Sequence, residues 1–140
     1  MMQSNAALNS AVFHWPIRVY YEDSDAGGVV YHSNYLNFME RARTEWLRTF
    51  GYSNAAMMKE LGVMFVVRSM KVDYLKPAVL DDLLSVTARV KELGRSRVTL
   101  LQTVSRGEEL LTEGEVHLVC VTADSFKPVS VPDVLRKQWS

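Results

Sequence analysis

Three carboxylates lie within four residues of one another near the start of the chain, and two glycines follow them. They are Glu22, Asp23 and Asp25, with Gly27 and Gly28 soon after. A carboxylate in such a loop can act as a nucleophile or as a general base. The same spacing is also typical of a turn in which an aspartate side chain bonds its own backbone. The residue types alone leave both interpretations open.

The chemistry of this loop depends on the helix that the following residues predict. We expect Ser33 or Asn34 to cap the start of that helix and Gly51 to end it. Free backbone N–H groups in the first turn of a helix, together with its positive dipole end, stabilise a developing oxyanion. A carboxylate facing those N–H groups would suit acyl transfer. The helix is indicated by apolar side chains at helical spacing, namely Tyr35, Met39, Ala42, Trp46 and Phe50.

His32 lies at the expected entrance to this helix. Its ring could shuttle a proton or donate a hydrogen bond to a substrate, or it could close the helix cap or stack near Tyr31 and Tyr35. The other two histidines, His14 and His117, fall on separate predicted strands. Three scattered histidines and a single cysteine do not make a zinc site, so we expect no metal.

Charged residues on the helix and at a later turn allow two interpretations each. Glu40 with Arg43 could form an ordinary ion pair on a solvated face, although a helix wrapped by a sheet could also present such charges to a second subunit. Lys91, Arg95 and Arg97 surround a predicted turn. They could bind phosphates through charge-assisted hydrogen bonds, or they could be charges that protect a sheet edge.

Around the helix the chain predicts mostly strands. Pro16 is expected near the start of a strand or on an edge strand, because it cannot donate to a ladder. A short helix over residues 54–61, capped by Ser53 and ended by Gly62, follows the long one. Gly114 indicates a bulge or a close backbone approach, and residues 125–140 a loop with a short terminal turn. Alternation or apolar runs indicate strands over residues 13–22, 63–76, 83–93, 95–106 and 110–123.

The order of these elements predicts the fold class. A strand, a long helix, a short helix and about four consecutive strands favour an antiparallel sheet of about five strands wrapped around the long helix. This is an α+β architecture known as the hotdog fold. We expect one domain over residues 1–140, with a flexible lead-in over 1–11 and a terminal tail over 133–140. Apolar residues on the outer sheet face and exposed edge strands would favour a two-fold dimer.

Composition excludes several classes of protein. Sixteen basic residues balance sixteen acidic residues, so no overall field would recruit nucleic acid. The sequence has one cysteine, Cys120, which fits a reducing compartment. This cysteine lies in an apolar run, which favours a position in the core. The sequence contains no apolar run long enough to cross a bilayer and starts without a signal-peptide pattern, so we expect a cytoplasmic protein.

Three segments carry a resemblance to a known family. They are RVYYEDSDAGGVVYHSNYLNFMERARTEWL, FVVRSMKVDYLKPAVLDDLL and GEVHLVCVT. Together they resemble the 4-hydroxybenzoyl-CoA thioesterase family of hotdog proteins, and within it the YbgC type associated with the Tol-Pal system of Gram-negative bacteria. The resemblance implies hydrolysis of acyl-CoA to a free acid and CoA without metal or cofactor.

The resemblance also implies roles for particular residues. Asp25 matches the catalytic aspartate, described as a nucleophile or as a base that activates water. The backbone N–H that polarises the thioester carbonyl falls at His32. Gly28 keeps the approach to the carbonyl open, and Tyr35 lines the pocket.

The family places its active sites between two subunits, commonly within a dimer of dimers, which would be a homotetramer here. It binds CoA phosphates on the strand and turn that include Arg95 and Arg97. Two other functions are compatible with the sequence. One is a partner of acyl carrier protein or of phospholipid synthesis with secondary thioesterase activity. The other is a dehydratase using His32 and Glu40. The acyl chain stays open, as does the choice between CoA and acyl carrier protein as carrier.

Overall fold

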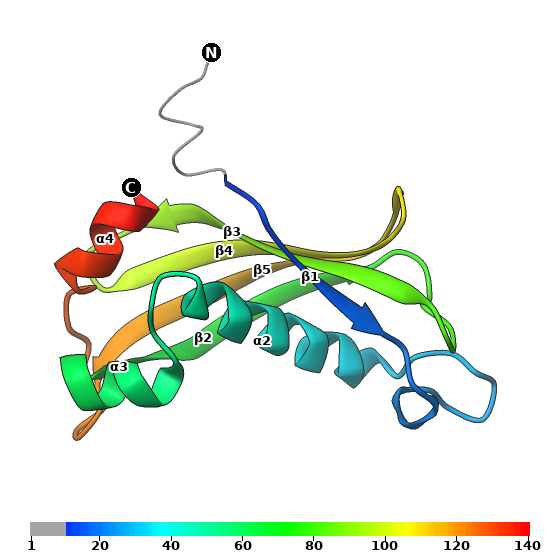
Figure 1. The fold of residues 1–140 in the computed structure, drawn as a ribbon, viewed down its shortest axis with the longest axis horizontal. Coiled ribbons are helices and arrows are strands. Elements are labelled where there is room, and N and C mark those ends of the chain that lie inside the picture. Colours follow the sequence, from blue (N-terminus) through cyan, green and yellow to red (C-terminus); the bar gives the residue numbers. More distant parts are fainter. Residues whose placement is uncertain (1–10) are drawn as a thin grey trace, which may run out of the picture.

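The expected long helix is α2, His32–Arg48, and a curved sheet of five antiparallel strands wraps around it (Figure 1). The computed structural model describes residues 11–140, so almost all of the expected flexible lead-in lies outside it. The strand order in the sheet is β1-β3-β4-β5-β2. The α+β arrangement predicted from the sequence is confirmed. The strands are β1 Phe13–Arg18, β2 Val63–Tyr74, β3 Leu83–Leu93, β4 Arg97–Arg106 and β5 Glu109–Thr122.

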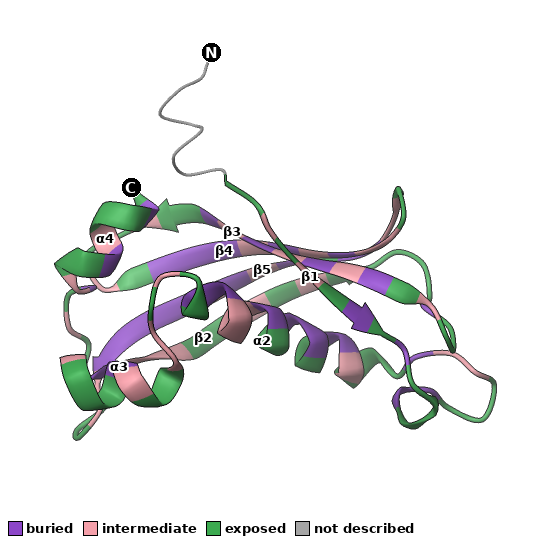
Figure 2. Cartoon of the chain, viewed as in Figure 1, coloured by how far each residue is buried: buried purple, intermediate pink, exposed green. Residues whose placement is uncertain are grey.

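The helix packs its apolar stripe against the concave face of the sheet (Figure 2). Close approach is possible because Gly114 of β5 lies beneath Met39. A Cβ at Gly114 would lie 3.2 Å from the Met39 Cε and 3.3 Å from its Sδ. The close approach expected at Gly114 is thus made by a side chain, while the Lys71 backbone oxygen lies 3.6 Å from the same Cβ position. The sheet register does not shift at Gly114; the shift in β5's pairing with β4 lies between Val104 and Ser105.

The start of α2 differs from the expectation. Tyr31 occupies the N-cap position, and its side chain makes no capping hydrogen bond. The predicted cap at Ser33 or Asn34 is wrong, because Asn34 lies inside the helix. Its side-chain amide instead donates to the backbone oxygen of Asp23 at 3.1 Å and to the Asp23 Oδ1 at 3.2 Å. Asp23 thus holds the loop to the start of the helix through the Asn34 side chain.

Other local signals in the sequence hold. The Ser53 Oγ accepts a hydrogen bond from the Ala56 N–H at 3.0 Å and caps α3, Asn54–Leu61. Gly62 ends that helix with a φ of +68°, a conformation that favours glycine. Pro16 lies on β1, an edge strand of the sheet. However, β1 ends at Arg18 rather than Glu22, because the chain turns through a 3-10 turn, η1, Tyr21–Asp23.

The C-terminal residues form a helix, which corrects the expected loop with a short turn. Helix α4, Asp133–Trp139, follows Pro132 and buries Leu135 and Trp139, which share one face. The Trp139 ring stacks on Trp46 of α2 with 4.9 Å between ring centroids. This tail therefore closes one end of the core.

The outer sheet face is more polar than expected. Its centre carries alternating charges, including an ion pair between Lys91 of β3 and Glu115 of β5. The sequence predicts apolar residues on this face; Val12 and Leu101 lie there, among mainly charged and polar neighbours. The edge of β2 stays open in the described chain, with Val67 45% exposed. No helix within residues 11–140 is long and apolar enough to cross a membrane.

Candidate active site

Asp25 lies in the loop between η1 and α2, and its two carboxylate oxygens differ. Oδ1 accepts hydrogen bonds from the backbone N–H groups of Gly27 at 2.8 Å and Val29 at 3.2 Å. Within the described residues no donor bonds Oδ2 of this exposed side chain. Asp25 therefore closes its own turn with one oxygen, as the turn interpretation of the sequence predicts. Its role in catalysis stays a prediction.

The glycines after Asp25 fit this loop tightly. A Cβ at Gly27 would lie 3.3 Å from the Asp25 Oδ1, which is closer than most real contacts. Gly28 has a φ of +80°, where side chains are strained, and a Cβ at this position would meet no atom within 4 Å. The backbone conformation at Gly28 therefore favours glycine and leaves open space over it, whereas a side chain at position 27 would require the Asp25 carboxylate to shift by a few tenths of an ångström.

Asp23 is the structural carboxylate of the loop. It is 8% exposed, and its Oδ2 accepts from the Tyr20 N–H at 2.9 Å. Its backbone oxygen and Oδ1 accept from the Asn34 side chain, and its backbone oxygen also accepts from the Tyr31 N–H at 3.3 Å. Asp23 thus joins the Asp25 loop to the first turn of α2. The spacing of residues in the sequence could not show which aspartate is structural, because the partners of Asp23 are a backbone N–H and a side chain on the helix.

The first turn of α2 presents N–H groups that intrahelical bonding leaves unused. Among residues 11–140, the backbone N–H groups of His32 and Ser33 have no acceptor. The His32 ring stacks on Tyr74 at the end of β2, with 4.4 Å between centroids and 16° between planes. The Tyr74 hydroxyl donates to the backbone oxygen of His32 at 3.3 Å. Stacking is one of the roles expected of this ring, but its partner is Tyr74.

Tyr35 is buried one turn further along α2. Its hydroxyl accepts a hydrogen bond from the Ala78 N–H at 2.8 Å. Burial is the largest cause that raises the pKa of Tyr35 above its ordinary value, and the Ala78 bond partly opposes it. Tyr35 also lines a cavity of about 160 Å³ at the helix entrance, together with His32, Tyr74 and Pro77.

The start of β4 and the loop before α2 lie at opposite ends of the sheet (Figure 1). Arg97 is the first residue of β4, and Asp25 belongs to that loop. Strand β4 ends at Arg106, next to residues 75–82, the connection between β2 and β3, which contacts the Asp25 loop. Ten residues of strand span about 30 Å at about 3.3 Å per residue. Within one chain, therefore, the structure does not bring Arg95 and Arg97 to Asp25. Arg97 lines a surface hollow of about 260 Å³ with Arg68 and His117.

A second cavity, of about 310 Å³, lies between α2 and β2. Arg43 lines it and points inward, where its Nη1 donates to the Gln102 Oε1 at 2.9 Å. Burial lowers the pKa of Arg43, partly offset by the charge of Glu40. The expected surface ion pair between these two residues is thus wrong for Arg43. Its inward direction could not be deduced from helical spacing because its acceptor comes from β4.

No group of histidine, cysteine, aspartate and glutamate side chains among the described residues is arranged to hold a metal ion. The absence of a metal and of a cofactor from the reaction stays a prediction.

Comparison with known proteins defines the class of this protein. Residues 27–113 match the family model of the thioesterase superfamily, and the chain belongs to that family. These residues include the loop glycines, α2 and most of the sheet. The fold and the resemblance predicted from the sequence are thereby confirmed.

Individual relatives and solved structures show which thioesterases the chain is similar to. The chain is 48% identical over 126 residues to the acyl-CoA thioester hydrolase YbgC of Escherichia coli O157:H7, covering 89% of this chain and 93% of the relative. It is 44% identical over 124 residues to the acyl-CoA thioesterase YbgC of Haemophilus influenzae, covering 89% and 91%. A probable thioesterase from Bartonella henselae superposes with a TM-score of 0.83 at 34% identity, covering 87% of this chain and all of that one. The DHNA-CoA thioesterase of Staphylococcus aureus gives 0.82 at 26% identity, covering 91% and 88%.

Proposed function

We propose that this protein hydrolyses acyl-CoA thioesters, with Asp25 as the reacting carboxylate. The observation that carries the proposal is the Asp25 loop itself. One carboxylate oxygen is held by two backbone N–H groups, and the other has no donor among residues 11–140. Asp23 fixes the loop to a helix start whose first N–H groups have no acceptor within the same residues. The names of the relatives support CoA as the carrier of the acyl group.

The reaction can follow two routes from this geometry. In one, Asp25 takes a proton from water while the water oxygen attacks the thioester carbonyl carbon. In the other, Asp25 attacks the carbon and water hydrolyses the resulting anhydride. Both routes release CoA as the thiol and the acyl group as a carboxylic acid. The N–H groups of His32 and Ser33 would stabilise the oxyanion, and one such donor typically contributes about 10²–10³ in turnover.

A two-fold dimer would complete this site. Arg97, Val119 and Val66 lie in one row of the sheet, towards the start of β2, whereas Tyr74 and His32 lie at its end. Antiparallel pairing of two open β2 edges reverses one strand against the other. It would therefore bring the basic hollow of one chain towards the helix entrance of the other. We propose that CoA phosphates bind at the partner subunit's Arg97, near Arg95, and that dimers assemble further into a tetramer.

The direct test compares wild type with Asp25→Asn in thiol release from a panel of acyl-CoA esters of different chain lengths. Asparagine keeps an Oδ1 for the Gly27 and Val29 N–H groups, so the loop keeps its shape while the charge is lost. We expect wild type to release CoA and Asp25→Asn to lose most of the rate. Reversing the charge at Arg97 should raise KM more than it lowers kcat. A variant at Asp25 with the full rate would contradict the catalytic assignment.

The alternative, a partner of acyl carrier protein or phospholipid synthesis, concerns the carrier and the cellular role. It predicts faster turnover of acyl carrier protein thioesters than of CoA thioesters, and a cellular function that survives loss of Asp25. An association with Tol-Pal is proposed by resemblance, and a cytoplasmic location is proposed from the sequence pattern. The dehydratase is disfavoured because Glu40 lies eight residues from His32, about 12 Å along the helix.

A further inference from the structure

The connection between β2 and β3, residues 75–82, forms the wall against which the Asp25 loop rests. The Val30 N–H donates to the Ala78 oxygen at 3.0 Å, and the Leu80 N–H donates to the Gly28 oxygen at 3.0 Å. These two bonds lie on either side of a bridge between Val29 and Val79. The conformation of the loop after Asp25 thus depends on the conformation of this connection.

The same connection also reaches the helix entrance. Ala78 donates its N–H to the buried Tyr35 hydroxyl, in the first turns of α2. Ala78 therefore touches both parts of the proposed site, through its oxygen on the loop side and its N–H on the helix side. A shift of Ala78 would move the carboxylate loop relative to the oxyanion donors.

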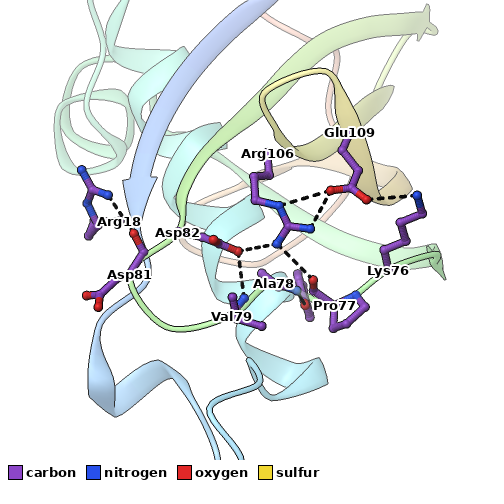
Figure 3. Close-up of polar contacts among 10 residues, drawn as sticks. Arg18, Lys76, Pro77, Ala78, Val79, Asp81, Asp82, Arg106 and Glu109 are labelled. Carbon is purple, nitrogen blue, oxygen red and sulfur yellow. Dashed lines mark hydrogen bonds and ion pairs between the residues drawn. The ribbon is translucent and has the colours of Figure 1, made fainter.

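Arg106 holds this connection from the opposite side (Figure 3). It ends β4, and its Nη1 donates to the Asp82 Oδ2 at 2.6 Å and to the Pro77 oxygen at 3.5 Å. Its Nη2 and Nε donate to the Glu109 Oε1 at 2.6 Å and 3.2 Å. The guanidinium thus joins both ends of the connection to the β4–β5 hairpin. A lysine could not make all of these bonds, because its ammonium is a single point of charge.

Further hydrogen bonds and an ion pair hold the connection in its conformation. The Asp82 Oδ2 also accepts from the Val79 N–H at 2.9 Å, and Lys76 pairs with Glu109 at 3.0 Å. Asp81 adopts a φ of +73°, which is unusual for a residue other than glycine, and its oxygen accepts from Arg18 at 2.7 Å. A residue other than glycine keeps such a φ only where the surrounding contacts hold it.

We propose that Arg106 is a positioning residue for thioester hydrolysis, which sets the Asp25 loop against the first turn of α2 through Asp82, Pro77 and Ala78. The inference rests on the proposed function of Asp25. It adds a group that touches no substrate and lies on the far side of the connection. The arginine acts on geometry, so its loss should lower kcat more than it raises KM.

The test measures steady-state kinetics with an acyl-CoA ester, thermal unfolding and amide hydrogen exchange for Arg106→Gln, Arg106→Lys and wild type. Arg48→Gln serves as the control, because Arg48 forms a surface ion pair with Glu45 at the distant end of α2. Exchange at Val30 and Leu80 reports directly on the two bonds between the loop and the connection. Exchange at Leu100, in the middle of β4, reports on the sheet.

We expect Arg106→Gln to lower kcat by about ten- to a hundredfold, since small misplacements of reacting groups cost about that much. KM should stay within about twofold, amide exchange should quicken at Val30 and Leu80 but not at Leu100, and Arg106→Lys should recover part of the rate. Arg48→Gln should behave as wild type.

Two results would overturn the inference. The first is an unchanged kcat in Arg106→Gln. The second is a loss of kcat in proportion to a lower melting temperature, together with faster amide exchange at Leu100. That combination would mark a general structural role. If wild type hydrolyses no ester, the proposed function fails separately. Exchange at Val30 and Leu80 then decides the positioning role, which is refuted if Arg106→Gln leaves it unchanged.

Discussion

Replacing Tyr35 by phenylalanine removes one oxygen atom from the junction of α2 with the β2–β3 connection. The ring is 2% exposed and keeps its edge-on contacts with Phe38 and Tyr74. The lost oxygen is the acceptor of the Ala78 N–H at 2.8 Å. The substitution therefore leaves the packing in place and deprives a buried donor of its partner.

The expected cost follows from that donor. Leaving a buried N–H without a partner costs about 1–3 kcal/mol in the free energy of unfolding. With a urea m-value of about 2 kcal/mol/M, a loss of about 2 kcal/mol lowers the unfolding midpoint by about 1 M. Protein concentration must be the same for both proteins, because an oligomer unfolds in a concentration-dependent way.

Tyr31→Phe is the matched control for this change. Tyr31 is 51% exposed and lies at the N-cap position, directly before α2. Surface substitutions of this kind usually change stability by less than about 0.5 kcal/mol. If Tyr35→Phe unfolds at the same urea concentration as wild type, the Ala78 bond does not hold the connection to α2.

Three further predictions concern other parts of the molecule. Trp139→Ala should lower the free energy of unfolding by about 3–5 kcal/mol in urea titration, because the buried ring packs against Trp46 of α2 and Phe65 of β2; a cost below about 1 kcal/mol would contradict the role of α4 in the core. Burial raises the pKa of the Cys120 thiol to about 11, so a disulfide reagent such as dithionitrobenzoate should react with it only after unfolding; rapid reaction of the native protein would contradict that. Burial raises the pKa of Tyr35, so its contribution to stability is fully present below about pH 10, the ordinary tyrosine value, and is lost as pH rises through the native pKa. Wild type should therefore lose more stability than Tyr35→Phe as pH rises above about 10, and parallel losses would refute this.

The sequence predicts the parts of this structure that depend on local patterns. The apolar stripe of α2, the cap at Ser53 and the alternation in β3 are each encoded within a few residues, and each element appears where it is expected. The carboxylate loop before α2 is equally local. Its position next to a helix start follows from chain order alone.

The rest depends on contacts between residues far apart in the chain. His32 stacks on Tyr74, 42 residues away, and Arg43 bonds Gln102, 59 residues away. Neither pairing leaves a mark in the spacing of the residues. Two prolines precede the terminal helix and predict an irregular tail, whereas the long-range contacts of Trp139 and the burial of Leu135 explain why that helix forms.

The separation of the two aspartates is the most consequential case. Asp23 and Asp25 have the same chemistry and nearly the same place in the chain. Asp23 bonds Tyr20 and Asn34, whereas Asp25 keeps one oxygen without a donor in the part of the chain that the structure describes. The family resemblance indicates Asp25, and the hydrogen bonds give a physical reason for that choice. Asp23 is expected to matter for stability.

The measurement that tests the account most directly is CoA release by Asp25→Asn and by Asp23→Asn, beside wild type, with folding checked by circular dichroism. We predict that Asp25→Asn keeps its melting temperature within a few degrees and loses at least about 99% of kcat, since it removes the reacting group. Asp23→Asn should lose stability and keep a larger share of its rate. Full activity in folded Asp25→Asn, or a greater loss of kcat in Asp23→Asn, would contradict the central claim.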